Sequence, residues 1–280
     1  MAAIVGATGL WGCSGGVIAG LDVNGLAAAA IVELVTGVVL VALGLAQGGR
    51  PVAAIAGLGR LLPLLAVMET ANVALYYVAL QLAPVGPVMA LHLTAPVMLT
   101  AVELARGRRR LTPAQVGSLL LICAALAVLG LGGRFVGNRP HLVVGLLLSL
   151  VSAGCIAVFI TIVSKVAGKT SPTMGAGVQM LCSGLVLAPA LFVIRVATDD
   201  LVSLVMTAAS LFAPACLLYW RAMRDLAPIT AGRVQLAEPL FGAVAAMAIF
   251  AIRPSGFEAF SAVLVLVAVL LELRAPLMES

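Results

Sequence analysis

Long apolar runs alternate with short connections along the whole chain, and each connection contains charged residues, proline or glycine. A helix needs about 20 mostly apolar residues to cross a bilayer. We therefore predict ten transmembrane helices, at about residues 2–20, 26–46, 61–81, 84–105, 113–131, 141–164, 174–195, 201–221, 228–250 and 256–273. The connections are short throughout, so they leave no room for a soluble domain.

One of these stretches occurs twice in the chain. Residues 75–97, LYYVALQLAPVGPVMALHLTAPV, return as LYWRAMRDLAPITAGRVQLAEPL at residues 218–240. The two copies share Leu-Tyr at their start and a proline near their end, and matches at the same offset continue into the next apolar run. Self-similarity at a fixed spacing indicates a duplicated unit. We therefore predict two five-helix repeats, residues 1–140 and 141–280.

Composition supports a membrane protein. Hydrophobic residues make up 63% of the chain and charged residues only 10%, whereas soluble domains carry about 25% charged residues. The net charge of +5 does not indicate a nucleic-acid partner, because the basic residues lie in short clusters between the apolar runs. The fold class expected is an all-α polytopic membrane protein.

The basic residues also predict the topology. With a cytoplasmic N-terminus, the inner loops hold most of them, including RGRRR at residues 106–110, and the outer loops hold only Arg134, Arg139, Arg195 and Arg253. Because Lys and Arg favour cytoplasmic loops, both termini should be cytoplasmic, in a plasma (inner) membrane. Five helices per repeat invert the second copy, as in secondary transporters that bind their solute near the midplane.

Glu238 is the first candidate for the site. It lies ten residues after Pro228, or about 15 Å along a helix and about half of a hydrocarbon core. A carboxyl at that depth is costly unless it is paired, protonated or exposed to a cavity. Pro239 follows it and Pro96 is its equivalent in the first copy. We expect both prolines to kink their helices and release backbone carbonyls towards a solute path.

The third predicted helix carries a polar stripe. Glu69, Asn72 and Tyr76 are spaced i, i+3 and i+7, so they share one face of a helix made otherwise of apolar residues. This face should point into the bundle, where it either binds solute or forms hydrogen bonds between helices. Glu33 in the second predicted helix is a similar case.

Further candidates occupy the repeated segment and the first helix. His92 and Gln235 are equivalent positions, and Gln235 shares a helix face with Glu238. His92 could exchange a proton, or it could only form hydrogen bonds. Arg233 either contacts a solute carboxylate or extends to the membrane surface. Trp11, beside a face of glycines, lines the cavity or packs in lipid.

These residues resemble a known family. ALYYVALQLAP at residues 74–84, RRLTPAQ at 109–115 and LAEPLFGAV at 236–244 are similar to the EamA branch of the drug/metabolite transporter superfamily. Residues 72–96 also resemble its threonine/homoserine exporter subgroup. The resemblance implies export of amino acids or other small metabolites. The chain departs from the family at residues 108–112 and in the equivalent turn of the second copy, where the usual Gly-Glu turn is absent.

We interpret the chain as a secondary active transporter, and not an enzyme, in which two inverted halves expose a central cavity alternately to each side. The sequence contains no nucleotide-binding motif, so no cofactor is expected and a solute or proton gradient would supply the energy. The proton site would be Glu238 or Glu69. The expected partners are a small-molecule solute, such as an amino acid, together with protons and lipid, but no nucleic acid.

Three alternatives stay open at this stage. The first is a multidrug or other metabolite carrier of the same superfamily. The second is an intramembrane enzyme acting on a lipid, which would need paired Asp motifs or a zinc-binding helix; the sequence has neither. The third is a structural membrane subunit, which the ionisable residues at depth make less favourable.

Overall fold

The computed structural model describes residues 1–83, 85–105, 112–133, 141–250 and 256–274, and within them the chain is all helix and turn, with no strand. The predicted all-α class is therefore confirmed. The departures from the family pattern at residues 108–111 and 252–255 lie outside the described residues.

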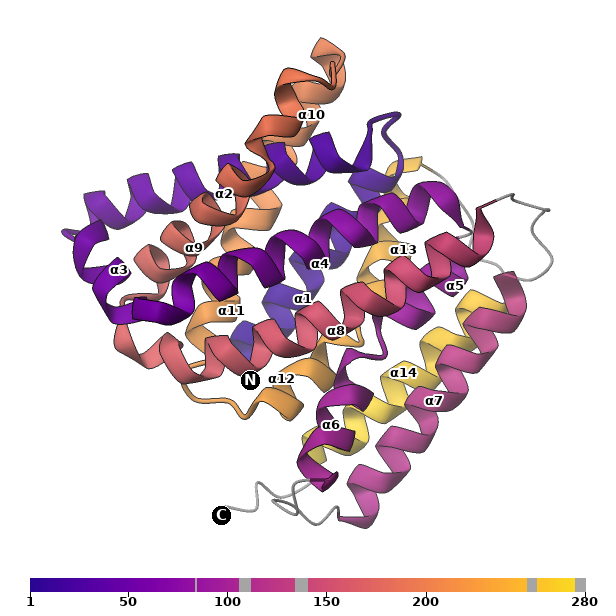
Figure 1. Cartoon of the computed structure of the whole chain (residues 1–280). Coiled ribbons are helices and arrows are strands. Elements are labelled where there is room, and N and C mark those ends of the chain that lie inside the picture. Colours follow the sequence, from indigo (N-terminus) through magenta and orange to yellow (C-terminus); the bar gives the residue numbers. More distant parts are fainter. Residues whose placement is uncertain (84, 106–111, 134–140, 251–255, 275–280) are drawn as a thin grey trace.

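The α-helices follow one another with short connections (Figure 1). Their bounds are α1 Ala2–Ala19, α2 Gly25–Ala46, α3 Pro51–Leu58, α4 Leu62–Leu82, α5 Val85–His92, α6 Ala95–Ala105, α7 Pro113–Gly133, α8 Leu142–Val166, α9 Pro172–Leu187, α10 Thr198–Thr207, α11 Ala213–Ala222, α12 Pro228–Gln235, α13 Glu238–Phe250 and α14 Gly256–Arg274. A π-helical turn, Ala208–Phe212, joins α10 to α11.

Local sequence sets where several helices begin. Asn24 caps α2, because its side-chain oxygen accepts a hydrogen bond of 3.0 Å from the backbone N–H of Leu26. Ser171 caps α9 in the same way through the N–H of Met174, at 3.2 Å. Proline stands in the first turn of α9 and α12, where its missing N–H costs nothing.

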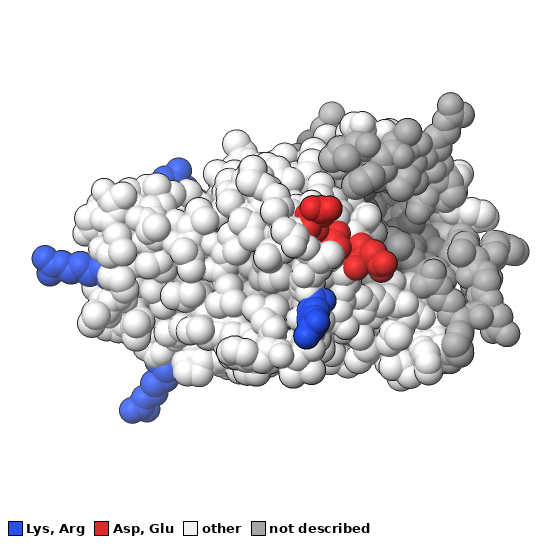
Figure 2. Space-filling view, turned by 90° about the horizontal axis from the view of Figure 1, so that it is seen from above, with Lys and Arg blue, Asp and Glu red and all other residues white. Residues whose placement is uncertain are grey.

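Within the described residues, five helices are long and apolar enough to cross a membrane, and shorter apolar helices accompany them. The five are Gly25–Ala46, Pro51–Leu82, Leu142–Lys169, Pro172–Phe192 and Thr198–Ala222. Uncharged residues form most of the face in Figure 2, with charged side chains at only a few points. Large apolar side chains such as Val52, Leu120 and Val143 are exposed on the surface. The chain is therefore an integral membrane protein, and the predicted number of ten spans stays a prediction.

Two of the predicted spans are each broken into a pair of short helices. The span at 84–105 consists of α5 and α6, and the span at 228–250 consists of α12 and α13. Each break lies just before a proline, Pro96 or Pro239, which cannot donate a hydrogen bond back to the preceding turn. Equivalent hydrogen bonds close the two turns. In the first, the N–H of Thr94 donates to the carbonyl of Leu91 at 3.1 Å; in the second, the N–H of residue 237 donates to the carbonyl of residue 234 at 3.0 Å.

Glycines bring α2 and α9 into close contact. A Cβ on Gly177 of α9 would lie 2.7 Å from the backbone nitrogen of Val41, and one on Gly184 would lie 2.6 Å from that of Leu34. On α2, a Cβ on Gly37 would overlap the backbone of Leu181. Small residues at such positions allow two helix backbones to pack directly.

Replacing Gly177 by alanine should lower the melting temperature of the purified protein. Alanine normally favours a helix over glycine by about 1 kcal/mol, but here the new methyl group meets the backbone of α2, and overpacking costs about 1–3 kcal/mol. Gly154→Ala is the matched control, because nothing lies within 4 Å of the position of its added Cβ. A Gly177→Ala melting temperature at or above that of the control would contradict this packing.

Candidate functional site

A cavity of about 70 Å³ lies inside the bundle, and residues from both halves of the chain line it. Its wall consists of Trp11, Ser14 and Gly15 of α1, Glu69, Asn72, Val73, Tyr76 and Tyr77 of α4, His92 of α5, Ile156 and Phe159 of α8, Phe212 of the π-helical turn, Gln235 of α12 and Glu238 of α13. The volume is enough for several water molecules or part of a small solute.

Most of the predicted site residues meet on this wall. Those brought together are Trp11, Glu69, Asn72, Tyr76, His92, Gln235 and Glu238. The structure does not bring Glu33 or Arg233 to the wall. Glu33 lies on α2, fully buried, and neither of its carboxyl oxygens has a hydrogen-bond partner in the described part of the chain. Arg233, on α12, is only 1% exposed, so its side chain does not reach the surface as the snorkelling alternative requires.

The two helix breaks place the polar residues at the cavity. His92 is the last residue of α5 and Gln235 the last residue of α12, while Glu238 is the first residue of α13. A second cavity of about 20 Å³ adjoins the first and shares these three residues, and Pro96 and Gly232 also line it. Each of the two predicted spans is thus divided by a two-residue turn, and both turns border the same space.

Gly12 fixes the position of Glu238. A Cβ on Gly12 of α1 would overlap the backbone carbonyl of Glu238, and it would lie 2.9 Å from Cβ of Phe241 and 3.0 Å from the nitrogen of Gly242. Only glycine therefore allows α1 to pack against the first turn of α13. A carboxylate in the first turn of a helix is stabilised by the partial positive charge of that helix end.

Ser152 of α8 joins the α4 stripe to the α5 break. Its hydroxyl lies 2.9 Å from the backbone carbonyl oxygen of Asn72, 3.0 Å from Oδ1 of Asn72 and 3.0 Å from Nδ1 of His92. The carbonyl can only accept, so the single hydroxyl proton points to Asn72 and Nδ1 of His92 donates to Ser152. In the neutral imidazole, Nε2 is then an acceptor. The amide of Asn72 is in turn a hydrogen-bond partner of Glu69.

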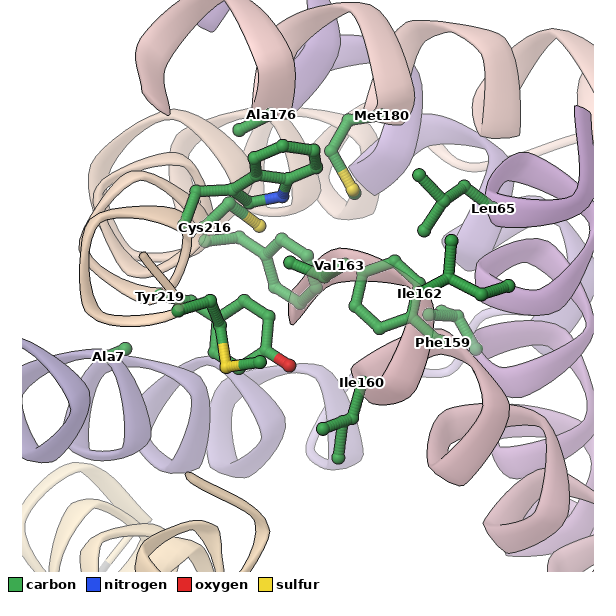
Figure 3. Close-up of a cluster of buried hydrophobic side chains, with 14 of the residues drawn as sticks. Ala7, Leu65, Phe159, Ile160, Ile162, Val163, Ala176, Met180, Cys216 and Tyr219 are labelled. Carbon is green, nitrogen blue, oxygen red and sulfur yellow. The ribbon is translucent and has the colours of Figure 1, made fainter. Parts of the chain in front are cut away.

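Aromatic rings form the rest of the wall. The ring of Tyr76 lies against His92 with centroids 4.3 Å apart, and Trp11 lies 6.1 Å from Phe212 and 5.1 Å from Tyr219. Phe159, which also lines the cavity, stacks on Tyr219 with ring centroids 6.2 Å apart. Figure 3 shows Phe159 and Tyr219 among the buried side chains of this cluster.

Sequence reasoning missed several residues of the site. Phe159 and Phe212 have the apolar character of ordinary core positions, and nothing in their sequence neighbourhood marks them. Tyr77 follows the polar stripe by one position, off its helical face. Ser152 was detectable in principle as a polar residue within an apolar run, but such serines are common in membrane helices.

The second half of the chain resembles a known transporter family. Residues 143–274 match the model of the EamA-like transporter family. This segment covers α8 to α14 and includes Gln235 and Glu238, whereas Trp11, the α4 stripe and His92 lie outside it. The threonine/homoserine exporter subgroup stays a prediction.

The fold is also that of a solved protein, described only as "Crystal structure of protein". The likeness has a TM-score of 0.74 and covers 97% of this chain and 96% of that one, at 18% sequence identity. Identity this low shows a shared fold and nothing further. No curated protein matches the chain. In the described residues, no group of three or more His, Cys, Asp or Glu side chains is placed to hold a metal ion.

Ser152→Ala should lower the melting temperature, because it removes the hydroxyl that bridges Asn72 and His92. A net hydrogen bond contributes about 0.5–1.5 kcal/mol, and a buried group left without a partner costs about 1–3 kcal/mol. Ser203→Ala is the control, since the hydroxyl of Ser203 donates to the carbonyl of Asp199 one turn earlier in α10, in an exposed position. Equal melting temperatures for the two variants would show that the bridge contributes nothing to stability.

Proposed function

We propose that the chain is a secondary active transporter that moves a small polar solute through the central cavity by alternating access. The observation that carries this proposal is the cavity itself, where two carboxyl groups, two amides and an imidazole meet at two interrupted helices inside a membrane protein. Interrupted helices of this kind form the solute sites of many secondary transporters. The match of residues 143–274 to a transporter family supports the same function.

Alternating access requires two halves that can exchange roles, and the helix contacts support two repeats, residues 1–140 and 141–280. The repeat makes α1 equivalent to α8, and α4 equivalent to the helix formed by α10 and α11. Accordingly α4 packs on α8, and α11 packs on α1. The equivalent pairs α2 with α9, and α7 with α14, pack on each other (Figure 1). This exchange of contacts is what an inverted repeat with a central two-fold axis requires.

The direction and the driving force are part of the proposal. We propose export of amino acids or related small metabolites across the plasma (inner) membrane, with both termini in the cytoplasm, as the loop charges and the family resemblance favour. Glu238 and Glu69 both face the cavity, so either can be reached by solute and by protons during a cycle. A carboxyl that alternates between a proton and a solute group would couple the two fluxes.

Gly15→Leu should abolish transport without unfolding the protein. Gly15 lines the cavity and no atom lies within 4 Å of the position of its added Cβ, so leucine fits by occupying the solute path. The measurement is uptake of a panel of radiolabelled amino acids and amines into proteoliposomes, with the melting temperature recorded beside it. Gly154→Leu, equally unobstructed but outside the cavity wall, should keep its rate. A stable Gly15→Leu protein with normal flux would place the path elsewhere.

Glu238→Gln should remove the response of transport to a pH gradient. The glutamine keeps the shape of the side chain but cannot carry a proton, so solute accumulation driven by the gradient should be lost while exchange of labelled for unlabelled solute continues. The control is Asp225→Asn, which changes an exposed carboxyl in the loop after α11. The assignment is wrong if the transport rate and its pH dependence both stay unchanged in the glutamine variant.

A further inference from the structure

We infer that the cavity binds a small organic cation, which has an ammonium group and no carboxylate, more tightly than the amino acid with the same hydrocarbon group. The inference rests on the proposed function and narrows its solute class. It depends on the charges of the cavity wall, on the direction of its hydrogen bonds and on its aromatic rings.

The charges of the wall have one sign. Glu69 and Glu238 are its acidic residues, and no Lys or Arg stands among the described residues that line either cavity. A third carboxyl, that of Glu33, lies behind the wall, close enough for its charge to interact with that of Glu69. Arg233, the basic residue expected to hold a solute carboxylate, is not part of either wall. An entering carboxylate would meet no Lys or Arg among the described residues of either wall, whereas an ammonium group would meet carboxyl groups of opposite charge.

Three side chains of the wall already use their donors within the protein. The amide of Asn72 is used by Glu69, and Nδ1 of His92 donates to Ser152. The hydroxyl of Ser14 donates to the backbone carbonyl of Trp11 at 2.8 Å. The indole N–H of Trp11 has no hydrogen-bond partner among the described residues, and it is a neutral donor. The acceptors at the cavity include the carboxyl oxygens and Nε2 of His92, and these suit an ammonium group, which has three donors and no acceptor.

The aromatic rings favour a cation as well. Trp11, Tyr76, Tyr77, Phe159 and Phe212 all line the larger cavity. The face of an aromatic ring carries partial negative charge and attracts an ammonium group within about 6 Å of its centroid. The same rings provide apolar surface for the hydrocarbon part of the solute.

The helix ends at the cavity do not reverse this preference. The C-termini of α5 and α12 bring partial negative charge to the two breaks, and the N-termini of α6 and α13 bring partial positive charge to the same places. These contributions oppose each other over a few ångströms. An ionised carboxyl group carries a full charge, so it outweighs these opposed partial charges when it has released its proton.

A matched set of three ligands tests the inference. Phenethylamine carries only the ammonium group, phenylalanine carries ammonium and carboxylate, and 3-phenylpropanoate carries only the carboxylate. Each is titrated into the purified full-length protein by calorimetry near neutral pH. We expect phenethylamine to bind at least about tenfold more tightly than phenylalanine, and 3-phenylpropanoate to bind most weakly, because a charge-assisted contact of this kind contributes about one power of ten or more in affinity.

Variants at the carboxyl groups show whether the preference comes from the cavity. Glu69→Gln and Glu238→Gln should each lower the affinity for phenethylamine by about tenfold or more, and Glu238→Asp, which keeps the charge, should restore part of it. Asp225→Asn is the surface control and should have no effect. Melting temperatures of all variants separate lost binding from lost folding.

The outcomes distinguish this inference from the proposed function. Phenylalanine binding as tightly as phenethylamine, or no binding of phenethylamine at all, overturns the cation preference and leaves the transporter function to the flux assay. Selective binding of phenethylamine that both glutamine variants retain also overturns the inference, because the selectivity would then come from elsewhere. Selective binding that the variants abolish, without flux in proteoliposomes, supports the cation site and contradicts the transporter function.

Discussion

A helix that breaks inside a bilayer leaves backbone carbonyls without partners, and this constraint decides where the site of this protein can lie. Interrupted helices are tolerated only where protein surrounds them or where they border a polar cavity. The breaks at residues 93–94 and 236–237 meet this condition together, because both border the same two adjoining cavities. The turns are closed by equivalent short-range hydrogen bonds. The polar residues beside them therefore share one cavity.

Close backbone contacts hold the two breaks at this place. Gly12 allows α1 to pack against the first turn of α13, which carries Glu238, and the glycines of α2 and α9 bring these two helices together. Lipid offers little driving force for helix association, so shape and direct packing supply it. The Ser152 bridge adds a polar connection from α8 to Asn72 and His92. The position and the chemistry of the cavity site thus depend on glycine and serine residues that are far apart in the chain.

Much of the architecture could be predicted from sequence. Apolar run lengths indicated membrane helices, because the bilayer sets one length for every helix that crosses it. Polar residues in those runs indicated the site, since burial in lipid is costly, and Glu69, Asn72, His92 and Glu238 do meet at the cavity. The prolines marked where two predicted spans are divided into pairs of short helices. Glu33 has the same sequence signal as Glu69, yet it lies behind the wall.

The sequence by itself determined that the chain folds as apolar helices in a membrane, that one segment is repeated, and which residues are costly to bury. These properties are local, because they depend on composition, spacing and the missing N–H of proline. The tertiary structure decided which of the costly residues share one space, that Arg233 lies away from it, and that Phe159 and Phe212 complete it. Such choices depend on how helix faces pack across the two halves, and the sequence of one helix does not specify its neighbour.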